Sequence, residues 1–420
     1  VYLHAMIRDK YGRKMSKSLG NVIDPLEVIN GCTLEAMLEK IRHGNLDPSE
    51  VEKASQGKRQ DFPDGIPMCG TDALRFGLLA YTIQGININL DIQRVIGYRN
   101  FCNKLWNAVK FGLMNLEGFS ATQEEIEHID VKSLAPRDQW ILSRLSQTAA
   151  ACNKNFADYE FANVTTQTYN FWLYTLCDRY LEMIKPVING SDAEAKKKAQ
   201  MTLYICLEQG LRLLHPMMPF ITEELWQRVT ARPGFKYPQS IMLASYPVEN
   251  PAWTNPKLEE EMELLDAMVH EARSLKSDYN LTRKNNPTFY LAAADDETLA
   301  VLQSLAEDFK TLSQAGEVIV SKDAEFPHSC AMKHINTKVT VLVNLQGIVD
   351  FAQEITKLTA HLKDIQARKE KLEGKMSVEA YVKVPEDIKE RDSKKLAELT
   401  EELKKVQESI SRFQELAKSD

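Results

Sequence analysis

Two apolar seams near the C-terminus constrain the fold most strongly. Their members recur at alternating steps of three and four residues, with a polar interruption at Lys369. The first seam contains Phe351, Ile355, Leu358, Leu362, Ile365, Leu372 and Met376, and the second contains Leu396, Leu399, Leu403, Val406, Ile410 and Phe413. This spacing is typical of helices that pack against another helix. Because a turn region with Pro385 separates the seams, we expect an antiparallel coiled-coil hairpin; pairing between two chains is the alternative.

The flanks of the expected hairpin are balanced in charge. Residues 354–420 contain 15 Lys or Arg and 15 Asp or Glu. An RNA contact on this arm must therefore be local. The candidate patch consists of Lys363, Arg368, Lys369, Lys371 and Lys375. The alternative is the solvated charged flank that coiled coils ordinarily carry.

The apolar period between residue 95 and about residue 230 is helical. We expect helices at 99–108, from Pro136, within 169–182, at 193–214 and after Pro219, with Thr222 as a candidate N-cap of the last. Several helices in succession with short connections predict an antiparallel helical bundle.

Two sets of side chains on this bundle are candidates for RNA contact. Arg94, Arg99, Lys104 and Lys110 follow one helix and could meet phosphates, or could form a solvated face. Tyr169, Phe171, Trp172 and Tyr174 could stack on unpaired bases, or could fill the bundle core.

The remaining segments are less regular. Residues 32–69 are polar and broken by prolines, and we expect a weakly structured surface insertion there. A helix should begin near Gly70, with Thr71 or Asp72 as its N-cap. Residues 236–256 resemble a linker, and residues 258–345 mix helical and extended patterns, which predicts a small α/β module.

A lysine-rich stretch near the N-terminus carries the clearest chemical signal. It reads Gly-Arg-Lys-Met-Ser-Lys-Ser-Leu-Gly-Asn over residues 12–21, between a short apolar strand-like stretch and an expected helix. Lys14 and Lys17 lie among Gly and Ser, a composition suited to a loop whose ammonium groups close over polyphosphate. A solvated loop without a ligand is the alternative.

Composition limits the classes of protein and the kinds of site that the chain can represent. The net charge of -7 argues against indiscriminate nucleic-acid binding. The seven cysteines include no Cys-x-x-Cys pair, so we expect no disulfide framework, zinc or other metal site. Without an 18-residue apolar run or a signal peptide, we expect a soluble intracellular protein with no membrane contact. Because the chain begins with Val1 and not Met, we expect it to be cut from a longer polypeptide.

Together, these stretches resemble the C-terminal part of valyl-tRNA synthetases, a family of class I aminoacyl-tRNA synthetases, in the eukaryotic cytosolic form. The resemblance covers the lysine-rich stretch, Gly70–Phe76, Arg99–Ala108, Phe171–Leu181, Leu211–Glu224, Asp278–Arg283 and the terminal hairpin. It implies a mainly α-helical chain in four parts. These are the end of a Rossmann-type catalytic domain at 1–94, a helical anticodon-binding bundle at 95–250, a small α/β module at 251–348 and a coiled-coil tRNA-binding arm at 349–420.

The resemblance also implies a two-step reaction. Valine and ATP form valyl-adenylate and pyrophosphate, and the valyl group then passes to tRNA(Val). Lys17 and Lys14 would be the catalytic residues, and Lys14, Met15, Ser16, Lys17 and Ser18 would bind ATP with its Mg²⁺. A translation-factor or multi-protein assembly is a further implied partner. The location would be cytoplasmic, with a mitochondrial form as the alternative.

Two features differ from the complete family pattern. Ile86 and Asn87 stand where the family usually has Arg and Asp, so any task of those two side chains is in doubt. The first class signature, of the His-x-Gly-His type, and the editing domain do not occur in this chain, so we expect no aminoacylation by the chain alone. The alternative is a non-catalytic tRNA- or protein-binding module from an isoleucyl- or leucyl-like relative.

Overall fold

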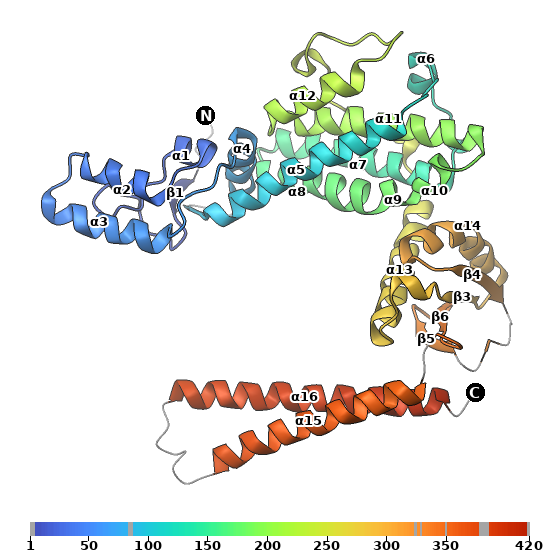
Figure 1. Cartoon of the computed structure of the whole chain (residues 1–420). Helices are drawn as coiled ribbons and strands as arrows, with labels where there is room; N and C mark the ends of the chain where they lie inside the picture. The colour runs from blue at the N-terminus through green and yellow to red at the C-terminus, as the bar shows by residue number, and fades with distance from the viewer. Residues whose placement is uncertain are drawn as a thin grey trace. The chain divides into compact units, whose positions relative to one another are not determined.

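The computed structural model describes residues 5–82, 87–322, 326–327, 330–348, 351–377 and 386–417. These residues form two compact units, 1–259 and 260–420, and are mainly helical, as predicted (Figure 1). The elements of the first unit are β1 (Met6–Asp9), α1 (Pro25–Asn30), α2 (Leu34–Arg42), α3 (Pro48–Asp61), α4 (Thr71–Ala80), β2 (Asn87–Leu90), α5 (Ile92–Asn115), α6 (Gln123–Glu127), η2 (Val131–Ser133), α7 (Pro136–Ala157), α8 (Phe161–Asn170), η3 (Phe171–Tyr180), α9 (Leu181–Met183), α10 (Lys185–Ile188), α11 (Ala193–Leu214), α12 (Pro219–Thr230), η4 (Ile241–Leu243) and η5 (Pro251–Trp253).

The N-terminal end of the first unit has the predicted strand, loop and helix. β1 and β2 form a parallel pair in which Met6 lies opposite Asn87 and Asp9 opposite Leu90. After the loop, the Asp24 side chain accepts a hydrogen bond from the backbone N of Leu26 at 2.9 Å and caps α1. Buried apolar side chains from α1, α2, α4, β2 and α5 form one core beneath these elements.

The prediction of weak structure for residues 32–69 is wrong. The segment contains α2 and α3, and the Thr33 side chain caps α2 by accepting from the backbone N of Ala36. α3 carries few apolar residues, so its composition resembles that of an exposed loop. It nevertheless buries Ala54 and Lys58, because small residues allow its backbone to lie close to its neighbours.

The two predicted helix caps around α4 and α12 are also wrong. α4 begins at Thr71 after Gly70, and no side chain caps it. The Asp72 carboxylate instead accepts hydrogen bonds from the backbone N of Phe220 at 3.2 Å and of Ile221 at 2.7 Å, at the start of α12. The Thr222 hydroxyl donates to the carbonyl of Met218 at 2.7 Å. Asp72 therefore caps a helix that lies 148 residues further along the chain.

The predicted bundle is built from α5, α7, α8, η3, α11 and α12 (Figure 1). α7 begins at Pro136 and α11 spans Ala193–Leu214, as the apolar period predicted. Phe101, Leu105 and Val109 of α5 are buried on one side, also as predicted. The aromatic segment Phe171–Tyr180 differs, because it forms a π-helix between two α-helices.

The second unit begins with the predicted α/β module. The module consists of α13 (Pro256–Asp278), η6 (Arg283–Asn285), β3 (Thr288–Ala293), α14 (Asp296–Ser313), β4 (Glu317–Lys322), β5 (Cys330–His334) and β6 (Val339–Asn344). Its first helix, α13, starts in the last residues of the first unit. The strand order is β4-β3-β6-β5, with β3 and β4 parallel and the other two pairs antiparallel. The sequence did not predict β5, a short strand in which Met332 is exposed.

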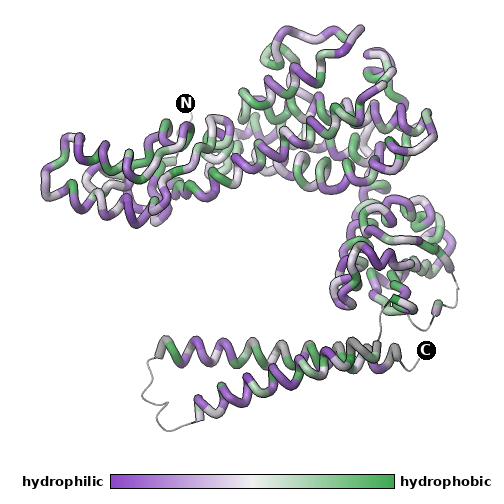
Figure 2. Tube along the Cα trace, viewed as in Figure 1, coloured by the Kyte–Doolittle hydropathy of each residue, from purple (hydrophilic) through white to green (hydrophobic). Residues whose placement is uncertain are grey.

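The C-terminal seams form the predicted helical hairpin. α15 (Phe351–Ser377) and α16 (Glu386–Ala417) run antiparallel and contact each other within the chain (Figure 1). Apolar residues recur along both helices between hydrophilic ones (Figure 2). Ile365 and Leu399 are buried. α16 begins at Glu386, ten residues before the second seam, and the predicted turn residue Pro385 lies outside the described residues.

No helix in the described ranges is long and apolar enough to cross a membrane. The seven cysteines, which all lie in these ranges, are free thiols.

Candidate nucleotide and RNA contact sites

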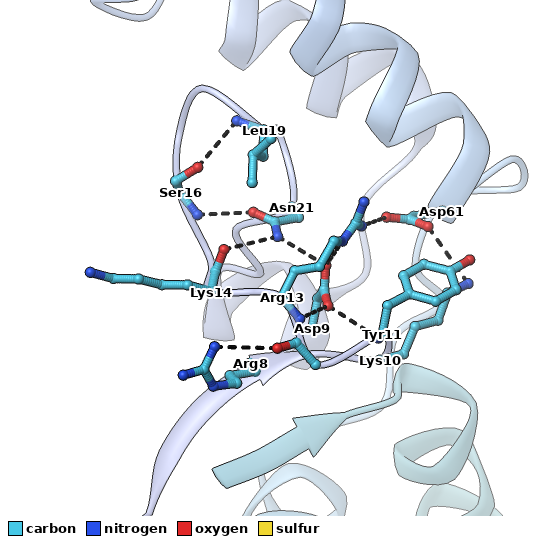
Figure 3. Close-up of polar contacts among 11 residues, drawn as sticks. Arg8, Asp9, Lys10, Tyr11, Arg13, Lys14, Ser16, Leu19, Asn21 and Asp61 are labelled. Atoms are coloured by element: carbon cyan, nitrogen blue, oxygen red, sulfur yellow. Dashed lines mark hydrogen bonds and ion pairs between the residues drawn. The ribbon is translucent and has the colours of Figure 1, made fainter.

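The lysine loop, defined here as residues 10–22, is organised by a buried carboxylate at the end of β1. Asp9 is 4% exposed and accepts hydrogen bonds from the backbone N of Tyr11 at 3.1 Å, the backbone N of Arg13 at 2.8 Å and Arg13 Nε at 2.6 Å (Figure 3). Asn21 Nδ2 donates to it at 2.9 Å. Burial favours the neutral acid, but the hydrogen bonds from Asn21 and Arg13 outweigh it and hold the pKa of Asp9 below its usual value.

Asn21 joins the two arms of the loop. Its Oδ1 accepts from the backbone N of Ser16 at 2.9 Å, and its Nδ2 also donates to the carbonyl of Lys14 at 3.3 Å (Figure 3). The Ser16 hydroxyl accepts from the backbone N of Leu19 at 3.3 Å and lies 3.3 Å from the Ser18 hydroxyl. Met15 packs against the core of the N-terminal elements. The backbone of the loop is therefore held by its own polar residues.

The two lysines of the loop lie at its exposed surface. Lys14 and Lys17 are exposed, and neither has a carboxylate partner within 4.0 Å among the side chains that the structure describes. Figure 3 shows the Lys14 side chain extending away from the hydrogen-bonded cluster. Two unpaired ammonium groups on a fixed backbone are suited to bind an anion with several charges, such as a polyphosphate.

The sequence did not identify three residues that hold the loop, which are Asp9, Asn21 and the α3 residue Asp61. Asn21 belongs to the quoted stretch, but nothing in its spacing shows that its amide reaches back to residues 9, 14 and 16. Asp61 contacts Arg13 from 48 residues away, which sequence patterns do not reveal.

The basic residues of α5 do not all share one face, although Arg99 and Lys110, eleven residues apart, are separated by only about 20° around the helix. Arg94, Arg99 and Lys104 are five residues apart, which turns each side chain by roughly 140° relative to the one before. The Arg94 guanidinium lies 4.4 Å from the centre of the Tyr81 ring, and Lys104 forms an ion pair with Asp178 at 3.4 Å. These three residues therefore do not form a single row along the helix, and their contact with RNA phosphates stays a prediction.

The aromatic candidates separate into buried and accessible rings. Phe171 and Trp172 are 2% and 1% exposed, and Trp172 Nε1 donates to the carbonyl of Gly210 at 3.1 Å. The prediction that these two rings stack on RNA bases is therefore wrong, and they fill the bundle core, which was the alternative. Tyr169 is half-buried and packs edge-on against Tyr174, which is 52% exposed, with 6.1 Å between ring centres.

A cavity on the bundle is lined by two of the candidate residues, Arg94 and Tyr169, and by others that the sequence did not suggest, Tyr98 and Asn170 among them. It has a volume of about 360 Å³ and lies between α4, α5 and α8. Tyr98 lies one helical turn after Arg94, and this spacing is the signal that could have identified it.

The candidate basic patch on α15 is largely neutralised. Arg368 pairs with Asp364 at 3.5 Å, Lys369 with Glu373 at 3.7 Å and Lys375 with Asp392 at 2.7 Å. Lys363 and Lys371 are exposed and have no carboxylate within 4.0 Å in the described part of the hairpin. These two lysines are the accessible positive charges of the patch.

No group of three or more His, Cys, Asp or Glu side chains within the described ranges could hold a metal ion. Of the two residues that depart from the family pattern, Ile86 lies outside those ranges, whereas Asn87 lies in β2 and its Oδ1 accepts a hydrogen bond from Arg8 Nε at 2.8 Å.

Comparison with known proteins matches three parts of the chain to families of tRNA ligases and nearly its whole length to individual ligases. Residues 1–91 match the family "tRNA synthetases class I (I, L, M and V)", residues 138–291 match "Anticodon-binding domain of tRNA ligase", and residues 350–414 match "Valyl tRNA synthetase tRNA binding arm". The valine–tRNA ligases of Mus musculus and Homo sapiens are each 47% identical over 422 residues, which are 99% of this chain and 33% of each ligase. The mitochondrial valine–tRNA ligase of Mus musculus is 39% identical over 99% of this chain and 38% of that protein.

Proposed function

Because the chain belongs to the valine–tRNA ligase family of class I aminoacyl-tRNA synthetases, as its C-terminal portion spanning about a third of the mouse and human ligases, we propose that it forms part of an enzyme that activates valine with ATP and transfers it to tRNA(Val). The observation that carries the proposal is the pair of unpaired ammonium groups, Lys14 and Lys17, on a loop fixed by Asp9 and Asn21.

In the first step, a carboxylate oxygen of valine attacks the α-phosphorus of ATP. The bond from that phosphorus to the bridging oxygen breaks, and pyrophosphate leaves with increased negative charge. Lys17, with Lys14, would neutralise this charge. Because the charge develops in the transition state, fixed cations beside it lower the energy barrier of the reaction. The Ser16 and Ser18 hydroxyls would donate to phosphate oxygens, and Met15 would keep the loop against the core.

In the second step, the terminal ribose hydroxyl of the tRNA attacks the valyl carbonyl and AMP leaves. Mg²⁺ would accompany ATP through its phosphate oxygens, where it offsets phosphate charge. The chain contributes the lysine loop and surfaces for tRNA. We infer that residues 1–94 complete the catalytic domain, 95–250 bind the anticodon region, 251–348 form a separate module and 349–420 hold tRNA through the hairpin.

The test uses a complete valine–tRNA ligase in which this chain supplies the matching third. We expect valine-dependent exchange of pyrophosphate into ATP, and we expect Lys17→Ala to lower its rate at least about tenfold without unfolding the protein. Lys53→Ala, an exposed lysine on α3, is the matched control and should leave the rate unchanged. An unchanged rate in Lys17→Ala would contradict the role of the loop.

The compartment is a proposal as well. The similarity to the cytosolic mouse and human ligases supports a cytoplasmic enzyme, although a mitochondrial ligase also matches nearly the whole chain.

A further inference from the structure

Both ends of the lysine loop are attached to the last turn of one helix, α3. At the first end, Arg13 Nη2 lies 3.2 Å from Asp61 Oδ2, and Lys10 Nζ lies 3.8 Å from Asp61 Oδ1 (Figure 3). At the second end, Lys58 Nζ donates to the carbonyl of Val22 at 2.7 Å. Lys58 and Asp61 are three residues apart and so lie on the same side of α3.

Lys58 is an unusual residue to bury. It is 5% exposed, and its burial lowers the pKa of its ammonium group. No carboxylate lies within 4.0 Å of it in the ranges that the structure describes, and its Nζ lies 5.0 Å from the centre of the Phe62 ring. Burying an ammonium group costs free energy, and the charges of Glu27 and Asp61 offset only part of this effect on the pKa of Lys58. The hydrogen bond from Lys58 to the carbonyl of Val22 gives the side chain a position-setting role.

The backbones of the loop and α3 are also in direct contact at this second end. A Cβ added to Gly20, whose φ is +65°, would lie 2.2 Å from the carbonyl oxygen of Ala54. A Cβ added to Gly57 would lie 2.8 Å from the carbonyl oxygen of Leu19. Only glycine at both positions allows this approach, which leaves the end of the loop resting on α3.

Among the contacts of the described residues, none attaches Lys14 or Lys17 at the centre of the loop to α3 through a side-chain hydrogen bond or ion pair. Lys14 and Lys17 remain exposed and without carboxylate partners among the described side chains. We propose that Lys58 and Asp61 are positioning residues that hold the two ends of the loop, so that α3 sets where the ammonium groups of Lys14 and Lys17 meet the nucleotide phosphates. The inference rests on the proposed function, because it assigns the lysines the same role.

The experiment measures valine-dependent pyrophosphate exchange in the complete ligase that carries this chain. Lys58→Met keeps an unbranched side chain one atom shorter and removes the hydrogen bond to Val22, and Asp61→Asn removes the charge that pairs with Arg13 and Lys10. Each variant should lower kcat about tenfold with an unchanged KM for valine. Lys53→Met on the exposed side of α3 and Asp64→Asn beyond its end are matched controls that should leave kcat unchanged.

A double variant separates positioning from general damage. If Lys58 acts through the loop, Lys58→Met should cost much less than tenfold when Lys17→Ala is already present, because residues acting as a unit are not additive. Equal losses on both backgrounds, or an unchanged kcat in both single variants, would overturn the proposal. An unchanged rate in Lys17→Ala alone would contradict the proposed function and this inference with it. If Lys58→Met does not fold, the same cycle with Asp61→Asn decides the question.

Discussion

At the scale of single residues, the backbone of the lysine loop is held by side chains other than its two lysines. Asp9 accepts hydrogen bonds from the backbone N of residues 11 and 13 and from the Asn21 side chain. Asn21 in turn hydrogen-bonds to the backbone of residues 14 and 16. The sequence identified Lys14 and Lys17, because two lysines among Gly and Ser suit a phosphate. It could not identify Asp9, since an aspartate at the end of a strand acquires its role only when the loop folds back over it.

Because His215 at the end of α11 is buried, we expect the folded chain to lose some stability as the pH falls. Its Nδ1 lies 2.7 Å from the Thr222 hydroxyl, and burial lowers its pKa although Glu223 and Asp72 raise it. Because the folded pKa lies below the unfolded value of about 6.5, the unfolded state takes up the proton first as pH falls. The stability contributed by neutral His215 is therefore fully present above about pH 6.5 and is lost as pH falls from there toward the folded pKa.

The measurement is urea unfolding of the chain at pH 7.5 and 5.5. We expect the loss of unfolding free energy between these two conditions to be smaller in His215→Asn than in the wild-type chain. His43→Asn, at an exposed histidine, is the control and should retain the wild-type loss. A pH dependence that is the same in all three proteins would show that His215 is not responsible.

At the scale of elements, the apolar period predicted the long helices well and the short or polar elements poorly. α7, α11 and the two hairpin helices carry apolar side chains at the helical spacing, so burial on one side follows from the sequence. The apolar period did not predict α3, because the residues that this helix buries are Ala54, Ser55 and Lys58. β5 is a five-residue strand recognisable only through its pairing with β6.

Sequence patterns also did not reveal that Asp72 caps α12, because the two are far apart in the chain. Replacing Asp72 tests this cap through the stability of the chain. Asp72→Ala removes the acceptor for the backbone N of Phe220 and of Ile221, so α12 loses its cap. Loss of an N-cap costs about 0.5–2 kcal/mol, and urea unfolding of the chain should show a decrease of this size. Thr71→Ala is the matched control, because Thr71 lies beside Asp72 and is the other residue that the sequence offered as a cap. A larger loss in Thr71→Ala than in Asp72→Ala would contradict the assignment.

At the scale of the whole molecule, charge limits how the chain can hold RNA. The net charge is -7, and most positive groups of the hairpin patch are already paired with neighbouring carboxylates. Affinity for a polyanion must therefore come from a few unpaired cations at defined places. The described structure offers such cations on the lysine loop, at Lys14 and Lys17, and on the hairpin, at Lys363 and Lys371.

Among the hairpin lysines, we expect Lys363 and Lys371, which have no carboxylate partner in the described part of the hairpin, to contact tRNA. Lys363→Ala with Lys371→Ala should weaken tRNA binding by the chain and reduce its salt dependence by roughly one unit of log–log slope for each phosphate that is no longer bound. Arg368→Ala with Lys369→Ala removes the same formal charge from the same helix, but these cations already pair with Asp364 and Glu373, so the effect should be smaller. Equal effects of the two pairs, measured by titration at several salt concentrations, would show that total charge matters and not pairing. Unchanged tRNA affinity after removal of residues 350–420, together with loss of association with other proteins, would assign the hairpin to an assembly instead.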